Sequence, residues 1–125
     1  RSYEPEIRNT VDVLSDSDWN AIHTGMRMVV ENTKEFDGFP IEAAGKTGTA
    51  QEDLKRPNHA LFVGYAPYDN PEISIATRIA NGYTSHNAAE VSKKILAYYF
   101  KVEDADSLLN GQAENINATS NGVND

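Results

Sequence analysis

The sequence contains no cysteine, and this absence excludes disulfides, thiolate metal sites and a cysteine nucleophile. It also lacks any apolar run near the roughly 18 residues that a membrane-spanning helix requires. Basic residues are few, with 11 Lys and Arg against 19 Asp and Glu, for a net charge of −8. Because no basic stripe occurs along the chain, the composition argues against nucleic-acid binding.

The length of 125 residues predicts one domain or part of one. The chain opens on Arg1 without a Met, and we interpret it as a piece of a longer protein. Residues 103–125 contain no Lys or Arg and are rich in Asn, Ser, Gly and acidic residues. Such a segment has too little apolar surface to offset the entropy of ordering. We therefore expect a structured region over 1–102 and a mostly disordered tail over 103–125.

The first half of the structured region predicts an extended segment followed by a helix. Pro5 disfavours helical angles at the residue before it, so 1–14 is expected to be extended. Ser15 and Asp18 have the spacing of a capping box, with Asp in place of the usual Glu. A helix from there to about Glu31 would carry one apolar stripe. The stripe consists of Trp19, Ile22, Met26, Val29 and Val30.

The second half predicts three strands and a helix. Residues 42–51 lack helical periodicity, and 59–66 form an almost wholly apolar run that is typical of a strand buried on both faces. Residues 72–80 alternate, and the short link before them predicts an antiparallel hairpin. Asn87 is expected to cap a last helix over 88–100. Three sequential antiparallel strands flanked by helices indicate the α+β class.

The stretch Gly45-Lys46-Thr47 has the spelling that ends a phosphate-binding loop. That loop needs a glycine at position 40, which is Pro40 and has no amide hydrogen to donate. It must also open a helix whose N-terminus faces the phosphates. Thr47-Gly48-Thr49 is a poor first turn, so the sequence argues against nucleotide binding.

The alternative is a strand that presents Lys46, Thr47, Gly48 and Thr49 at the rim of a cleft. Acyl transfer needs a nucleophile, a proton acceptor and amide donors where the oxyanion develops. A strand edge supplies an amide donor at a fixed place, and a glycine there lets a substrate approach closely. A hydroxyl and an ammonium nearby suit a substrate that ends in a carboxylate.

The sequence around this strand resembles that of a known protein family. "AAGKTGTAQ", then "HALFVGYAP" and "ISIATRIANG", resembles the C-terminal part of the transpeptidase domain of a class B penicillin-binding protein, of the penicillin-binding protein 2 type, in the serine β-lactamase and DD-peptidase superfamily. The resemblance covers roughly residues 8–100. It implies a fragment that holds the last three strands and the C-terminal helix of an antiparallel sheet flanked by helices.

By that resemblance the whole protein is a serine-type D-Ala-D-Ala transpeptidase that cross-links peptidoglycan stem peptides through an acyl-enzyme and binds β-lactams. Lys46 is implied to line the cleft and orient proton transfer, and Thr49 to offer its amide to the oxyanion and its hydroxyl to the terminal carboxylate. Thr47 and Gly48 are implied to form the edge along which the peptide lies, with Gln51 either at its outer end or merely in solvent. No metal or cofactor is implied. The family is anchored in the bacterial membrane, with its catalytic domain on the extracytoplasmic face.

The sequence departs from the family in one decisive respect, since it contains no Ser-x-x-Lys. Ser85-His86-Asn87 spells the family's Ser-x-Asn, but it follows the last strand instead of preceding the Lys-Thr-Gly strand, so we interpret it as a helix cap. The hypothesis is that this chain supplies one wall of the site, needs the rest of the transpeptidase domain, and is inactive alone. The alternative is a non-catalytic sensor or scaffold domain of the same fold.

Overall fold

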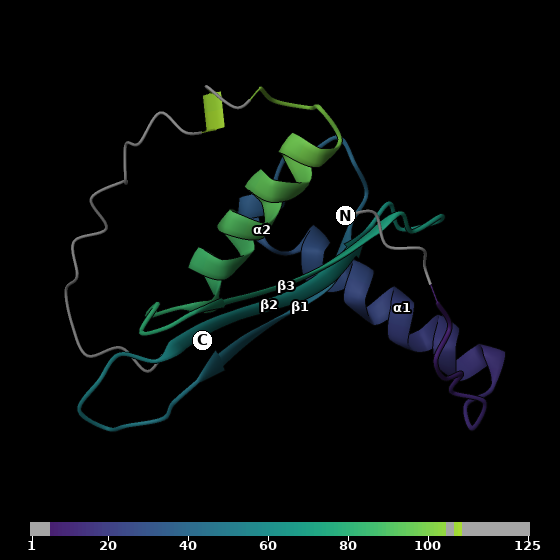
Figure 1. Cartoon of the computed structure of the whole chain (residues 1–125), viewed down its shortest axis with the longest axis horizontal. Helices are drawn as coiled ribbons and strands as arrows, with labels where there is room; N and C mark the ends of the chain where they lie inside the picture. The colour runs from purple at the N-terminus through teal and green to yellow at the C-terminus, as the bar shows by residue number, and fades with distance from the viewer. Residues whose placement is uncertain (1–5, 105–106, 109–125) are drawn as a thin grey trace.

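The computed structural model describes residues 6–104 and 107–108, and within them the expected α+β order is confirmed (Figure 1). Most of the tail predicted to be disordered lies outside the described residues. The short 3₁₀ helix η1 was not foreseen. The elements in chain order are α1 (Asp16–Glu31), η1 (Lys34–Phe36), β1 (Ala44–Ala50), β2 (His59–Ala66), β3 (Ile73–Ile79) and α2 (Ser85–Tyr99).

The start of α1 is fixed by the predicted capping box. The Asp18 amide donates to Ser15 Oγ at 3.3 Å, and the Ser15 amide donates to Asp18 Oδ2 at 3.0 Å. Hydrogen bonds from the Ser15 side chain and then its backbone lower the pKa of the Asp18 carboxyl. The carboxylate is therefore ionised at neutral pH. Its negative charge also interacts favourably with the positive N-terminal end of the helix dipole.

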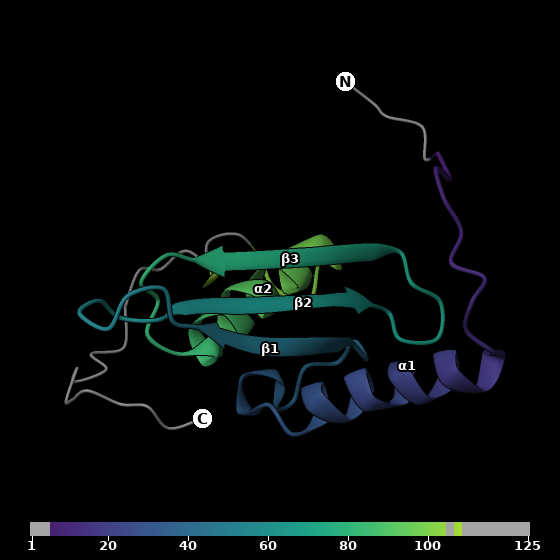
Figure 2. The same ribbon diagram turned by 90° about the horizontal axis from the view of Figure 1, so that it is seen from below.

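The three strands form one antiparallel sheet in the order β1-β2-β3 (Figure 2). Lys46 lies opposite Val63 and Thr47 opposite Phe62 in the first ladder, and Val63 lies opposite Ala76 in the second. Because directly opposed residues share a face of an antiparallel sheet, these registers decide which side chains lie together.

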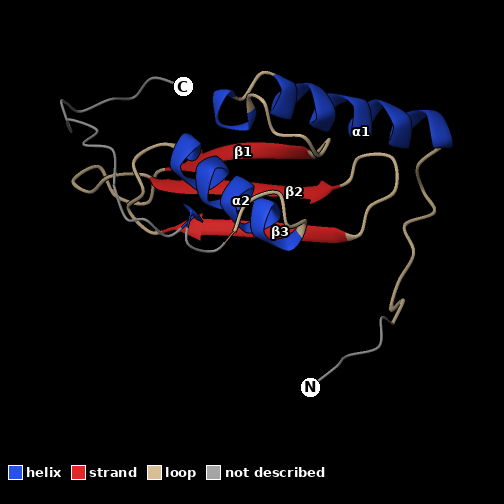
Figure 3. Cartoon of the chain, turned by 90° about the horizontal axis from the view of Figure 1, so that it is seen from above, coloured by secondary structure: helices blue, strands red, loops and turns tan. Residues whose placement is uncertain are grey.

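One face of the sheet is covered by α2, which crosses the strands as Figure 3 shows. The Thr77 and Ser92 hydroxyls lie 2.7 Å apart across this contact. Phe62 is at its centre, 1% exposed, and stacks on Phe36 with ring centroids 5.6 Å apart. The core therefore lies between the sheet, α2 and η1. Its other buried apolar members include Ala60, Ala66, Ala88, Ala89 and Leu96.

The opposite face of β2 is partly open, so the prediction that residues 59–66 are buried on both faces is wrong for this chain. Val63 is 49% exposed, and Leu61 is only half-buried. α1 covers one end of this face, where the His23 ring lies 5.6 Å from that of Tyr65. The apolar run was read correctly as a strand, but the described residues cover its second face only in part.

The last helix begins three residues earlier than the sequence indicated. Thr84, not Asn87, is the N-cap, with extended backbone angles and a hydroxyl that accepts from the His86 amide at 3.4 Å. The Asn87 side chain instead donates to the Gly82 carbonyl at 2.8 Å. The two residues are both good caps, and local spacing did not distinguish them.

Arg27 joins α1 to the segment before β1. Its guanidinium donates to the Ala43 carbonyl at 3.3 Å and lies 3.4 Å from Glu42. Its partly buried position follows from this bridge. Over the described ranges, neither helix has the length and hydropathy needed to cross a bilayer.

Candidate functional site

The Lys-Thr-Gly-Thr segment lies on β1, which is an edge strand of the described sheet. Thr47 and Thr49 lie opposite Phe62 and Ala60, which are buried beneath α2, so both threonine side chains share that face. Lys46 lies opposite Val63 on the open face. The strand therefore carries two hydroxyls on one face of the sheet and an ammonium on the other. A ligand that lies along the free edge of β1 could contact groups from both faces.

The Lys46 side chain folds back over its own strand. Its Nζ donates to the Thr47 carbonyl oxygen at 2.8 Å, and the side chain as a whole is exposed. The ammonium is thus held beside the β1 backbone instead of extending into solvent. This position brings a positive charge close to Thr47.

The two glycines of β1 differ in how much space surrounds them. A Cβ at Gly45 would lie 2.4 Å from Phe62 Cζ and 2.8 Å from the Val63 carbonyl oxygen, so core packing requires glycine there. A Cβ at Gly48 would meet only the Leu61 side chain, at 3.4 Å and beyond, which is an ordinary contact. Packing among the described residues therefore does not demand glycine at 48. The missing side chain leaves the open face beside Lys46 clear for close approach by another molecule.

The remaining predicted site residues continue along the same edge. Thr47 is half-buried, Thr49 is exposed, and Gln51 is exposed directly after the strand ends. The structure thus brings Lys46, Thr47, Gly48, Thr49 and Gln51 together on one contiguous stretch. Such an edge can provide amide donors, hydroxyls and one cation to a ligand that lies along it.

Ser85, His86 and Asn87 occupy the first turn of α2 and not the β1 edge. Ser85 is buried, with 5% of its surface exposed, and the Asn87 amide is engaged with Gly82. His86 Nδ1 lies 3.0 Å from Glu35 Oε2 on η1. The tripeptide that we interpreted as a helix cap is therefore the first turn of α2, and the cap itself is Thr84.

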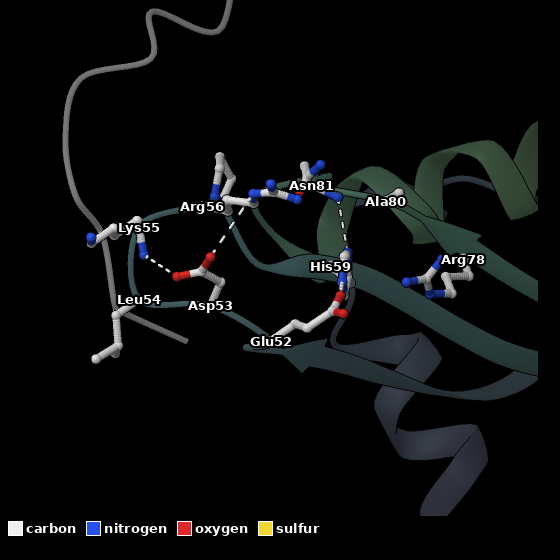
Figure 4. A pocket seen from close by; sticks show the side chains of 10 residues that line it. Glu52, Asp53, Leu54, Lys55, Arg56, His59, Arg78, Ala80 and Asn81 are labelled. Atoms are coloured by element: carbon white, nitrogen blue, oxygen red, sulfur yellow. Dashed lines mark hydrogen bonds and ion pairs between the residues drawn. The ribbon is translucent and has the colours of Figure 1, made fainter.

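A hollow of about 730 Å³ lies beyond the end of β1, at the β1–β2 loop (Figure 4). It is lined by residues 52–57 of the loop and by His59, Arg78, Ala80 and Asn81, and it includes none of the five predicted site residues. Arg78 is exposed here on the open face. His59 is the residue that the sequence did not single out. Its signal was a histidine at the base of a polar loop, where an apolar strand begins.

The described residues contain no group of three His, Asp or Glu side chains placed to hold a metal ion. His23 contacts the rings of Trp19 and Tyr65, and His59 and His86 each face one glutamate. The histidines of the described ranges thus have separate local partners.

Comparison with known proteins gives a family match and close relatives. Residues 4–97 match the model of the penicillin binding protein transpeptidase domain. The peptidoglycan D,D-transpeptidase MrdA of Haemophilus influenzae is 35% identical over 115 residues, which is 76% of this chain and 17% of that protein. The chain therefore spans about a sixth of the length of this curated relative.

Two solved structures extend the comparison. The PBP2 of Pseudomonas aeruginosa, in complex with WCK 5153, superposes with a TM-score of 0.66 at 31% identity, covering 78% of this chain and 23% of that one. The imipenem acyl-enzyme complex of penicillin-binding protein A from M. tuberculosis superposes with a TM-score of 0.62 at 23% identity, covering 70% of this chain and 20% of that one. The second likeness shows the fold alone.

Proposed function

Because the chain belongs to the penicillin-binding protein transpeptidase family, and corresponds to part of such a domain of the PBP2 type, we propose that it supplies one wall of a serine acyl-transfer site. The observation that carries the proposal is the β1 edge. It gathers Lys46, Thr47 and Thr49 around a glycine, Gly48, that packing does not require.

The reaction proposed for the whole protein is peptidoglycan cross-linking. The Oγ of a serine outside this chain attacks the carbonyl carbon of the penultimate D-Ala of a stem peptide. The bond to the terminal D-Ala breaks, and that residue leaves as a free amine after taking up a proton. An amine from a neighbouring stem then attacks the resulting ester, which forms the new peptide bond and releases the serine. A β-lactam acylates the same serine by opening its ring amide.

The β1 edge contributes electrostatics and position to these steps. The Thr49 amide donates to the oxyanion that develops on the attacked carbonyl, a preorganised interaction that is strongest in the transition state. The hydroxyls of Thr47 and Thr49 donate to the terminal carboxylate of the substrate. Gly48 lets the peptide lie close to the strand, with Gln51 at its outer end.

Lys46 supplies the positive charge of this wall. In this proposal its ammonium, which donates to the Thr47 carbonyl at 2.8 Å, attracts the substrate carboxylate and orients the groups that move the serine proton. The MrdA relative is named for D,D-transpeptidation. We extend that activity to the whole protein here, together with membrane anchoring and an extracytoplasmic site.

Labelling with a fluorescent penicillin tests the proposal. The whole protein is expected to form a covalent adduct that peptide mass spectrometry places on a serine outside residues 1–125, because this chain has no Ser-x-x-Lys. The isolated chain is expected to remain unlabelled, and prior incubation with unlabelled penicillin G should abolish the signal from the whole protein. An adduct on a residue of this chain would refute the division of the site. A whole protein that takes no label would favour a sensor or scaffold domain instead.

A further inference from the structure

His59 lies where three strand ends meet. It is the first residue of β2, it pairs with Ala50 at the end of β1, and only 9% of its surface is exposed. Both ring nitrogens have partners: Nε2 lies 2.5 Å from Glu52 Oε2, and Nδ1 lies 3.0 Å from the Asn81 amide nitrogen (Figure 4). The ring therefore joins the segment after β1 to the segment after β3.

These partners determine the tautomer of the ring. A backbone amide can only donate, so Nδ1 of His59 accepts the Asn81 N–H and carries no hydrogen. The proton of the neutral imidazole is then on Nε2, which donates to the Glu52 carboxylate. The hydrogen bond from His59 is the largest of the causes that lower the pKa of the Glu52 carboxyl, and desolvation opposes it. Glu52 is thus an ionised acceptor at neutral pH.

The bond to Glu52 anchors the first end of the β1–β2 loop. Further along the loop, the contacts of Asp53 are local, to the Lys55 amide at 2.8 Å and to Arg56 at 3.9 Å. At the second end of the loop, the Asn58 carbonyl accepts from the Tyr83 amide at 3.0 Å. The two ends are therefore held in different ways, one by the His59 side chain and one by backbone alone.

The first end matters because the proposed site ends there. Thr49 and Gln51 lie three residues and one residue before Glu52, on the stretch where β1 gives way to the loop. A change in the path of Glu52 would be transmitted directly to Gln51 and to the strand end that carries the Thr49 amide. Displacements of about 1 Å at such donors are enough to slow catalysis strongly.

We propose that His59 is a positioning residue for the acyl-transfer site, holding the end of β1 through its two-sided bridge between Glu52 and Asn81. The inference rests on the proposed function, since it assigns His59 a role in presenting Thr49 and Gln51. His59 touches no reacting atom. It acts through the backbone of β1, whose edge is proposed to contact the substrate.

Variants of the whole protein separate the two halves of the bridge. His59→Ala removes both bonds and is expected to slow acylation by a fluorescent penicillin about 10- to 100-fold. His59→Gln places an amide donor near the Nε2 position and should restore most of the rate. His59→Asn places an oxygen near Nδ1, so it should keep the Asn81 bond but remain slow. His86→Ala is the matched control, because His86 is an exposed histidine that also pairs with a glutamate, Glu35. This variant should leave the rate unchanged.

Hydrogen–deuterium exchange provides a readout that does not depend on acylation. Exchange over residues 51–58 is expected to rise in His59→Ala and His59→Asn and to stay near the wild-type level in His59→Gln. Unchanged exchange in His59→Ala would overturn the bridge itself. Faster exchange with an unchanged acylation rate would overturn its role in positioning. If the variants show the expected differences in exchange but the wild-type protein takes no penicillin, the proposed function is refuted. His59 would then anchor the loop without serving an acyl-transfer site.

Discussion

Replacing Lys46 by alanine in the whole protein is expected to lower the rate of acylation by a labelled penicillin by about 100-fold or more. The reason is the position of the ammonium, which the Thr47 carbonyl holds at 2.8 Å on the rim of the β1 edge. Removing it takes away the positive charge that attracts the carboxylate and orients proton transfer. The measurement is the second-order rate constant of acylation, followed by gel fluorescence over time.

Two further variants make the Lys46 result specific. Lys94→Ala removes an exposed lysine on α2 that pairs with Glu90 at 2.8 Å, and it should leave the rate unchanged. Lys46→Arg keeps the charge but replaces a compact ammonium by a planar fork, and it should recover only part of the loss. A Lys46→Ala protein that acylates within about threefold of wild type would contradict the cleft role.

Replacing Phe62 by alanine is expected to destabilise the chain by about 3–5 kcal/mol. Phe62 is 1% exposed and stacks on Phe36, and its ring lies where Cβ atoms at Gly45 and Gly64 would be, at 2.4 and 2.9 Å from ring carbons. Since neither glycine has a side chain to refill the space, the cavity cannot collapse easily. Urea denaturation of the whole protein and of its Phe62→Ala variant, followed by circular dichroism, measures the loss.

Leu54→Ala is the control for this experiment, because Leu54 lies on the β1–β2 loop and is 89% exposed. It should change the free energy of unfolding by no more than about 0.5 kcal/mol. A loss of under about 1 kcal/mol in Phe62→Ala would mean that the core is not built around this ring.

The strands and the first helix were predictable because their signals are local. The alternation over 72–80 gave β3, and the apolar run over 59–66 gave β2 with the observed bounds. Ser15 and Asp18 fixed the start of α1 through a bonding pattern that depends only on spacing. Turn chemistry and periodicity sufficed in each case, since no distant contact had to be known.

What failed were features set by tertiary contacts. Burial of β2 on both faces was inferred from its composition, but α2 covers only one face and leaves Val63 half exposed. The choice of Thr84 over Asn87 as the cap depends on where the chain leaves β3, since the Asn87 amide is drawn to Gly82. Sequence spacing carries neither piece of information.

The candidate site divides in the same way. The motif indicated Lys46 and its neighbours on one strand, and the register then placed the lysine and the threonines on opposite faces of that strand. The contrast between Gly45 and Gly48 needed the Phe62 ring in place. His59 was missed because its partners lie 7 and 22 residues away, at the ends of two other strands.

The central claim is that the β1 edge forms the carboxylate and oxyanion side of the acyl-transfer site. A crystal structure of the whole protein acylated by a β-lactam tests it most directly. The account predicts the β-lactam carboxylate at the hydroxyls of Thr47 and Thr49, and the acyl carbonyl oxygen at the Thr49 amide. An adduct whose carboxylate is instead bound away from β1, for example by Arg56 or Arg78 of the loop hollow, would contradict it.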